Sequence, residues 1–224
     1  MANKVLFAFM GFEALFVTGG IIILVVALLT RAALNGKQNL DNVANNLLLS
    51  QGPLTAAIVN AVFVFVTFLL CIPSIAAPTN RTFLKAHGYA VVCCAIFTLV
   101  VGLDVWFQTL NTRANLATVW GNQTTETQSL LQQRFNCCGY WNATSPPFIR
   151  DNVCTNTLVA ANLQGCIGPF SSFANSLNSM IFTADFGIVA IDVILILGIA
   201  CLLKDRKEKE RYALIDAKTG FGPI

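Results

Sequence analysis

The eight cysteines are the residues best suited to covalent or metal chemistry, and four of them lie in one polar segment near the carboxyl end. These four are Cys137, Cys138, Cys154 and Cys166. Four thiols can hold zinc or form two disulfides. Neighbouring cysteines fit a tetrahedral zinc site poorly, and the segment lacks histidine, so the pattern favours disulfides over a metal.

The adjacent pair restricts how these disulfides can form. The Cβ vectors of Cys137 and Cys138 point apart, so we expect each to bond to a more distant cysteine. Two pairings with Cys154 and Cys166 then remain open. Gly139 follows the pair directly and permits the positive φ that a tight turn would require.

A second kind of chemistry is indicated by acidic residues inside long apolar stretches. Residues 5–29, 54–72, 88–110 and 180–203 are each long enough to cross a bilayer. Their charged residues are Glu13, Asp104, Asp185 and Asp192. With 55% hydrophobic and 11% charged residues, the composition excludes a soluble domain, a disordered chain and a nucleic-acid-binding protein. We therefore predict an all-α membrane protein with four transmembrane helices.

Three roles are open for the intramembrane acids. They can stabilise helix packing through hydrogen bonds to neighbours such as Thr18, Asn60 and Thr183. They can line a polar cavity for a sterol or lipid headgroup, or an ion path.

The distribution of Lys and Arg predicts the topology, because basic residues favour the cytosolic side. The expected order is a cytosolic amino terminus (1–4), a small extracellular loop (30–53), a cytosolic turn (73–87), a large extracellular loop (111–179) and a cytosolic tail (204–224). These two loops are called the small loop and the large loop below.

The large loop is expected to be mainly helical and cross-linked. A helix is predicted over 111–135, and another begins at Gly168-Pro169 and continues into the fourth span. Residues 140–165 are typical of irregular structure. Asn122 and Asn142 begin glycosylation sequons.

On the predicted cytosolic side, the remaining cysteines are candidates for S-acylation, with a buried free thiol as the alternative. They are Cys71 and Cys201, nearest the span ends, and the deeper Cys93 and Cys94. Tyr212 to Ile215 fits a Tyr-x-x-apolar sorting signal. We expect neither an enzyme nor a metal site, since no catalytic set is visible and the only histidine, His87, falls in the predicted turn.

Four spans, a large loop between the last two, the Cys137-Cys138-Gly139 triplet and Gly165-Cys166 together resemble the tetraspanin family. The short tail and four-cysteine loop are most similar to fungal tetraspanins, including the type implicated in host penetration. The resemblance implies pairing of Cys137 with Cys166 and of Cys138 with Cys154. One departure is Asp151, which stands where the family has proline before the middle cysteine.

The resemblance also implies a function: a noncatalytic plasma-membrane scaffold, with an endosomal or vacuolar pool, that clusters partner proteins and other tetraspanins laterally. It further implies an intramembrane cavity that accepts a lipid or sterol. The alternative is a small-solute or ion transporter that uses the intramembrane acids, which lack basic countercharges within the spans.

Overall fold

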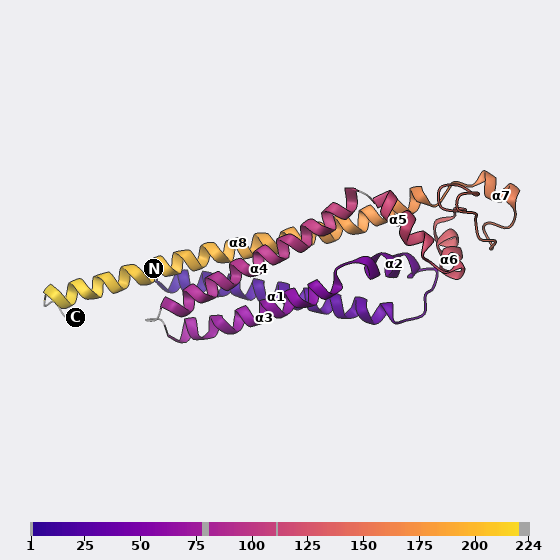
Figure 1. Cartoon of the computed structure of the whole chain (residues 1–224). Helices are drawn as coiled ribbons and strands as arrows, with labels where there is room; N and C mark the ends of the chain where they lie inside the picture. The colour runs from indigo at the N-terminus through magenta and orange to yellow at the C-terminus, as the bar shows by residue number, and fades with distance from the viewer. Residues whose placement is uncertain (1, 78–80, 111, 220–224) are drawn as a thin grey trace. The chain divides into compact units, whose positions relative to one another are not determined.

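The computed structural model describes residues 2–77, 81–110 and 112–219, which form eight helices and no β-strand (Figure 1). The helices are α1 (Ala2–Leu34), α2 (Val43–Gln51), α3 (Leu54–Ala76), α4 (Arg81–Leu110), α5 (Thr112–Gly121), α6 (Thr125–Phe135), α7 (Thr157–Asn162) and α8 (Ile167–Thr219). Four of them, α1, α3, α4 and α8, are long and apolar enough to cross a membrane. The prediction of an all-helical chain with four such helices is confirmed, and their length and composition suggest a membrane protein.

The helices extend beyond the predicted spans. The predicted turn 73–87 is largely helical, since α3 ends at Ala76 and α4 begins at Arg81. Helix α8 runs from Ile167 through the predicted fourth span and most of the predicted tail. Hydropathy marks only the apolar part of a helix, which continues wherever the backbone can keep its hydrogen bonds. Asn111, the first residue of one predicted helix, and residues 220–224 of the tail lie outside the described residues.

The chain divides into two compact units. Unit 1 comprises Met1–Val25, Thr55–Val100 and Asp185–Ile224. Unit 2 comprises Val26–Leu54 and Val101–Ala184, and so contains the small loop and the large loop.

Buried residues in unit 1 recur three and four positions apart along each helix. On α4 they include Leu84, His87, Val91, Cys94 and Thr98. On α3 they include Asn60, Val64, Thr67, Cys71 and Ser74, and on α8 they are Asp192, Leu195, Ile199 and Leu202. This spacing is typical of helices that pack as in a coiled coil. Large apolar side chains such as Phe7, Tyr89 and Leu197 are exposed on the same helices, as a lipid-facing surface requires.

Unit 2 has its own apolar core, formed by α2, α5, α6 and the start of α8. Its fully buried members include Val43, Leu131, Tyr140 and Phe170. Helix α2 belongs to the small loop, where the sequence analysis predicted no helix, and it packs against α6. Leu47 of α2 is buried in this core, so the small loop helps to build it.

Two local differences from the predicted large loop have identifiable causes. The predicted helix over 111–135 is two helices, because Thr124 adopts an extended conformation and caps α6 by accepting a hydrogen bond from the Thr127 amide. Within the predicted irregular segment, Asn156 caps the short helix α7 by accepting from the Val159 amide at 2.8 Å.

Candidate functional site

Two disulfides cross-link the large loop. They join Cys137 to Cys166 and Cys138 to Cys154, the pairing that the tetraspanin resemblance implies. The Cα atoms are 5.0 and 5.8 Å apart, within the range of ordinary disulfides. All four cysteines are fully buried, so the bridges lie inside unit 2 and not on its surface.

Gly139 makes the turn that follows the cysteine pair, as predicted. Its φ is +70°, and a Cβ atom there would overlap the carbonyl oxygen of Asn142. Gly165, beside Cys166, is similarly confined, because a Cβ atom would overlap the Trp141 carbonyl oxygen. Both bridges are therefore flanked by positions that accept only glycine.

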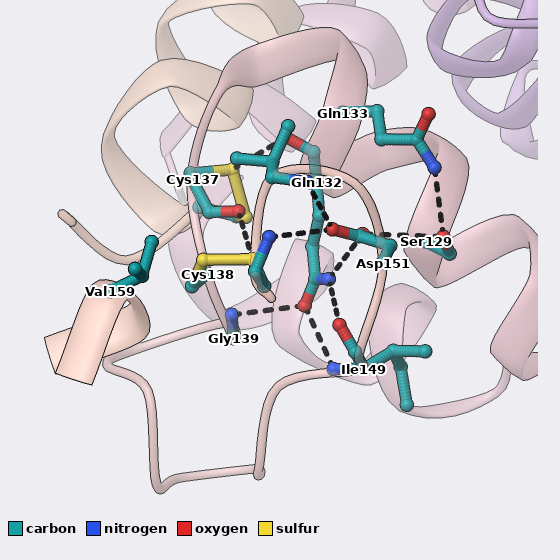
Figure 2. The surroundings of a disulfide bond; sticks show 12 residues. Ser129, Gln132, Gln133, Cys137, Cys138, Gly139, Ile149, Asp151 and Val159 are labelled. Carbon is teal, nitrogen blue, oxygen red and sulfur yellow. Dashed lines mark hydrogen bonds between the residues drawn. A yellow bond between two sulfur atoms is a disulfide. The ribbon is translucent and has the colours of Figure 1, made fainter. Parts of the chain in front are cut away.

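A buried amide connects these bridges to the rest of the loop. Gln132 on α6 has no exposed surface, and all its polar atoms are paired. Its Oε1 accepts from the amides of Gly139 and Ile149, both at 3.1 Å. Its Nε2 donates to the Ile149 carbonyl at 2.7 Å and to Asp151 at 2.8 Å (Figure 2).

Asp151 holds the turn before Cys154, at the position where the tetraspanins that the sequence resembles have a proline. Its Oδ1 accepts from the Val153 and Cys154 amides at 2.8 and 2.7 Å. Its Oδ2 accepts from Ser129 and Gln132. The carboxylate thus fixes the middle cysteine by hydrogen bonds in place of a rigid ring. The sequence analysis noted Asp151 only as a departure, and it missed Gln132.

Tyr140 anchors the loop to α5. Its ring lies 5.6 Å from that of Trp120, and its hydroxyl donates to the Arg113 carbonyl at 2.7 Å. Burial raises the pKa of Tyr140 to about 12, because the ionised phenolate would be desolvated there.

A cavity of about 430 Å³ lies in unit 2 among α2, α4, α5 and α8. Its lining is rich in amides: Gln51, Gln108, Asn115, Asn122, Gln123 and Asn178. None of the polar residues predicted to line a lipid cavity reaches it, although Gln108 donates a hydrogen bond to Asp104.

The two sequon asparagines and several apolar side chains are accessible on unit 2. Asn122 and Asn142 are exposed. The Asn142 Oδ1 accepts from the amide and hydroxyl of Thr144, both at 2.9 Å, which leaves its Nδ2 free of these bonds. Leu158 is 78% exposed and Trp141 49% exposed, so the loop presents apolar contact residues.

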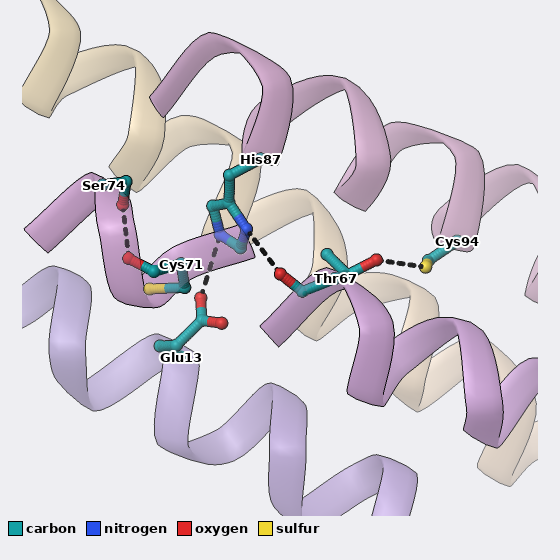
Figure 3. A network of polar contacts seen from close by, with 6 residues as sticks. All are labelled: Glu13, Thr67, Cys71, Ser74, His87 and Cys94. Atoms are coloured by element: carbon teal, nitrogen blue, oxygen red, sulfur yellow. Dashed lines mark hydrogen bonds and ion pairs between the residues drawn. The ribbon is translucent and has the colours of Figure 1, made fainter. Parts of the chain in front are cut away.

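In unit 1, Glu13 is buried against His87. The His87 Nε2 lies 3.2 Å from the Glu13 Oε2, and its Nδ1 lies 3.1 Å from the Thr67 carbonyl oxygen (Figure 3). Placing His87 in a turn was wrong, because it lies inside α4 and has no exposed surface. Leu84, His87, Val91 and Cys94 are all buried and lie three or four positions apart. This spacing is the sequence signal that would have placed His87 on the packed face of a helix.

The other predicted intramembrane polar residues do not join this pair in one site. Asn60 bonds to Thr98 at 2.8 Å, and Asp192 is buried with no hydrogen-bond partner for Oδ1 among the described residues. Asp104 is exposed and Asp185 is half-buried. Thr18 and Thr183, the suggested partners of the acids, instead donate to carbonyls of their own helices.

The four free cysteines differ in accessibility. Cys71 and Cys94 are buried, whereas Cys93 and Cys201 are exposed. The burial of Cys71 argues against its acylation, since an acyltransferase must reach the sulfur. Tyr212 and Ile215 of the predicted sorting signal lie exposed in the helical end of α8.

Comparisons of the chain with models of protein families, with curated proteins and with solved structures find no match.

Proposed function

We propose that this chain is a tetraspanin-like organiser of membrane proteins, a noncatalytic scaffold that gathers partner proteins and further tetraspanins beside it in the bilayer. The observation that supports this most directly is the pair of buried bridges from Cys137 and Cys138, placed between the third and fourth apolar helices. A rigid loop of this kind suits recognition, because little conformational entropy is lost when it binds.

The surface of the chain is consistent with lateral binding. Leu158 and Val159 on α7 are exposed apolar residues, and the spans expose many more. In the proposed topology the termini are cytosolic and the large loop is extracellular at the plasma membrane, where Asn122 and Asn142 can be glycosylated. By resemblance alone, the proposal extends to the development of fungal infection structures.

Crosslinking in native membranes, followed by purification in mild detergent, tests the organiser. We expect Leu158→Ser to reduce the set of crosslinked membrane proteins, and Thr157→Ala, an exposed neighbour on the same helix, to leave it unchanged. A wild-type chain that crosslinks to no membrane protein would contradict the proposal.

A further variant distinguishes the transporter alternative. A transporter that uses buried acids should lose solute flux with Asp192→Asn, whereas an organiser keeps its crosslinked neighbours.

Topology is tested separately by adding protease to intact cells, which should spare a carboxy-terminal tag and cleave within the large loop.

A further inference from the structure

Three side chains with metal-binding atoms meet in the interior of unit 1, each from a different helix. They are Glu13 of α1, Cys71 of α3 and His87 of α4, and one coordinating atom of each lies within 4.8 Å of the other two (Figure 3). Glu13 is 4% exposed, Cys71 1% and His87 0%. Buried acids and imidazoles of this kind need partners, because their desolvation is costly.

The hydrogen bonds of His87 fix which of its nitrogens is free. The Thr67 carbonyl oxygen can only accept, so the His87 Nδ1 at 3.1 Å must be the donor. In neutral imidazole, Nε2 then carries a lone pair, and it faces the Glu13 Oε2 at 3.2 Å. Two acceptors at this distance require a positive centre between or beside them, either a proton or a metal ion.

A proton would join only two of the available atoms. It would pair Nε2 with Oε2, but the Glu13 Oε1 would still lack a hydrogen-bond partner among the described residues. A metal ion beside the pair can instead be shared by the carboxylate, the imidazole and the Cys71 thiolate. Metal-binding histidines usually donate their other ring N–H to an acceptor that fixes the orientation of the ring. The Thr67 carbonyl oxygen, which accepts from the His87 Nδ1, is such an acceptor.

The donor set also indicates the kind of metal. One sulfur, one nitrogen and one oxygen suit zinc and similar transition metals, whereas magnesium and calcium prefer oxygen alone. Metal bonds of about 2.0 to 2.3 Å place tetrahedral ligand atoms about 3.3 to 3.8 Å apart, so only small side-chain movements are needed. A divalent ion with one carboxylate and one thiolate is neutral overall, which suits an apolar interior.

We propose that Glu13, Cys71 and His87 form a binding site for a divalent transition metal ion of the zinc type. The site ties together α1, α3 and α4, and its fourth position is left for water or another donor. It lies near the α3–α4 end of these helices, since α3 ends at Ala76 and α4 begins at Arg81. The proposal does not depend on the organiser function.

The test uses the full chain, purified in mild detergent without thiol reductant so that the loop disulfides stay intact. After chelator treatment it is titrated with cobalt(II) alone, and then with zinc. We expect one cobalt per chain with a sulfur-to-cobalt charge-transfer band, which zinc abolishes. The band should vanish in Cys71→Ser and remain in a Cys93→Ser/Cys201→Ser control. Glu13→Gln and His87→Ala should each weaken binding by about tenfold or more.

A second measurement needs no variant. Zinc should slow alkylation of Cys71 in the wild-type chain but not of Cys94, which is equally buried and contacts Thr67. The proposal is overturned if wild type shows no charge-transfer band, if the band persists in Cys71→Ser, or if zinc leaves Cys71 alkylation unchanged.

Discussion

The Gln132 amide donates to the Asp151 carboxylate at 2.8 Å, and this contact joins α6 to the turn that carries Cys154. The two residues are far apart in sequence and form hydrogen bonds to different backbone groups. Gln132 pairs the backbone of Gly139 and Ile149, while Asp151 pairs the amides of Val153 and Cys154. Together they pair four backbone amides and one carbonyl beside the disulfides.

Gln132→Ala should destabilise the large loop by about 3 kcal/mol, because buried backbone groups left unpaired cost about 1 to 3 kcal/mol each. Hydrogen exchange measured by mass spectrometry should show faster exchange around Gly139 and Ile149. Gln133→Ala is the matched control, since among the described residues the Gln133 side chain bonds only to Ser129. Equal effects of the two substitutions would show that the buried amide has no special role.

Cys137→Ser should release the Cys166 thiol and destabilise unit 2 by about 3 kcal/mol, because the bridge restricts the unfolded chain. Cys138→Ser should release Cys154 instead. Peptide mapping of the unreduced protein checks the wild-type connectivity. Recovery of Cys137 linked to Cys154 would contradict the pairing.

Gly139→Ala should disrupt the turn after the cysteine pair, since its φ of +70° disfavours a side chain and the new Cβ would overlap the Asn142 carbonyl. Gly168→Ala is the control, because no atom lies within 4 Å of a Cβ there. Thermal unfolding of the two variants should differ clearly, with a lower midpoint for Gly139→Ala. Similar midpoints would show that a Cβ atom at position 139 does not overlap the Asn142 carbonyl.

Unit 2 should lose stability as pH rises from about 10 to 12, and Tyr140 should contribute to the loss. The tyrosine pKa is 10.0 in its ordinary state and about 12 in the native protein. Between these values the unfolded chain releases a proton that the native chain keeps, so the contribution is complete below pH 10 and lost above 12. In a tyrosinate absorbance titration, the latest ionisation should disappear in Tyr140→Phe. An unchanged titration would contradict this assignment.

S-acylation, if the chain is modified, should fall on Cys201 and Cys93 and not on the buried Cys71 and Cys94. An acyl-exchange mass shift should decrease in Cys201→Ser and Cys93→Ser, and stay the same in Cys71→Ser and Cys94→Ser. A decrease confined to Cys71→Ser would show that its sulfur is accessible in the membrane.

The sequence alone determined the features that depend on composition and near neighbours. Long apolar runs must be helical in a bilayer, because no water is present to pair the backbone, so four spans could be predicted. Adjacent Cys137 and Cys138 cannot easily bond to each other, which limited the pairing, and Gly139 indicated a turn. These inferences concern one segment at a time.

Tertiary structure decided which distant polar groups meet. Nothing in the sequence marked Gln132 as buried, Asp151 was noted only as a departure from the family pattern, and His87 was predicted to lie in a turn. Hydropathy does not show which polar side chain will find a buried partner. The bond between Gln132 and Asp151, and the approach of His87 to Glu13, exist only because separate helices and loops pack together. The cost of burying a polar group without a partner makes such pairings specific, and only the packed fold supplies the partner.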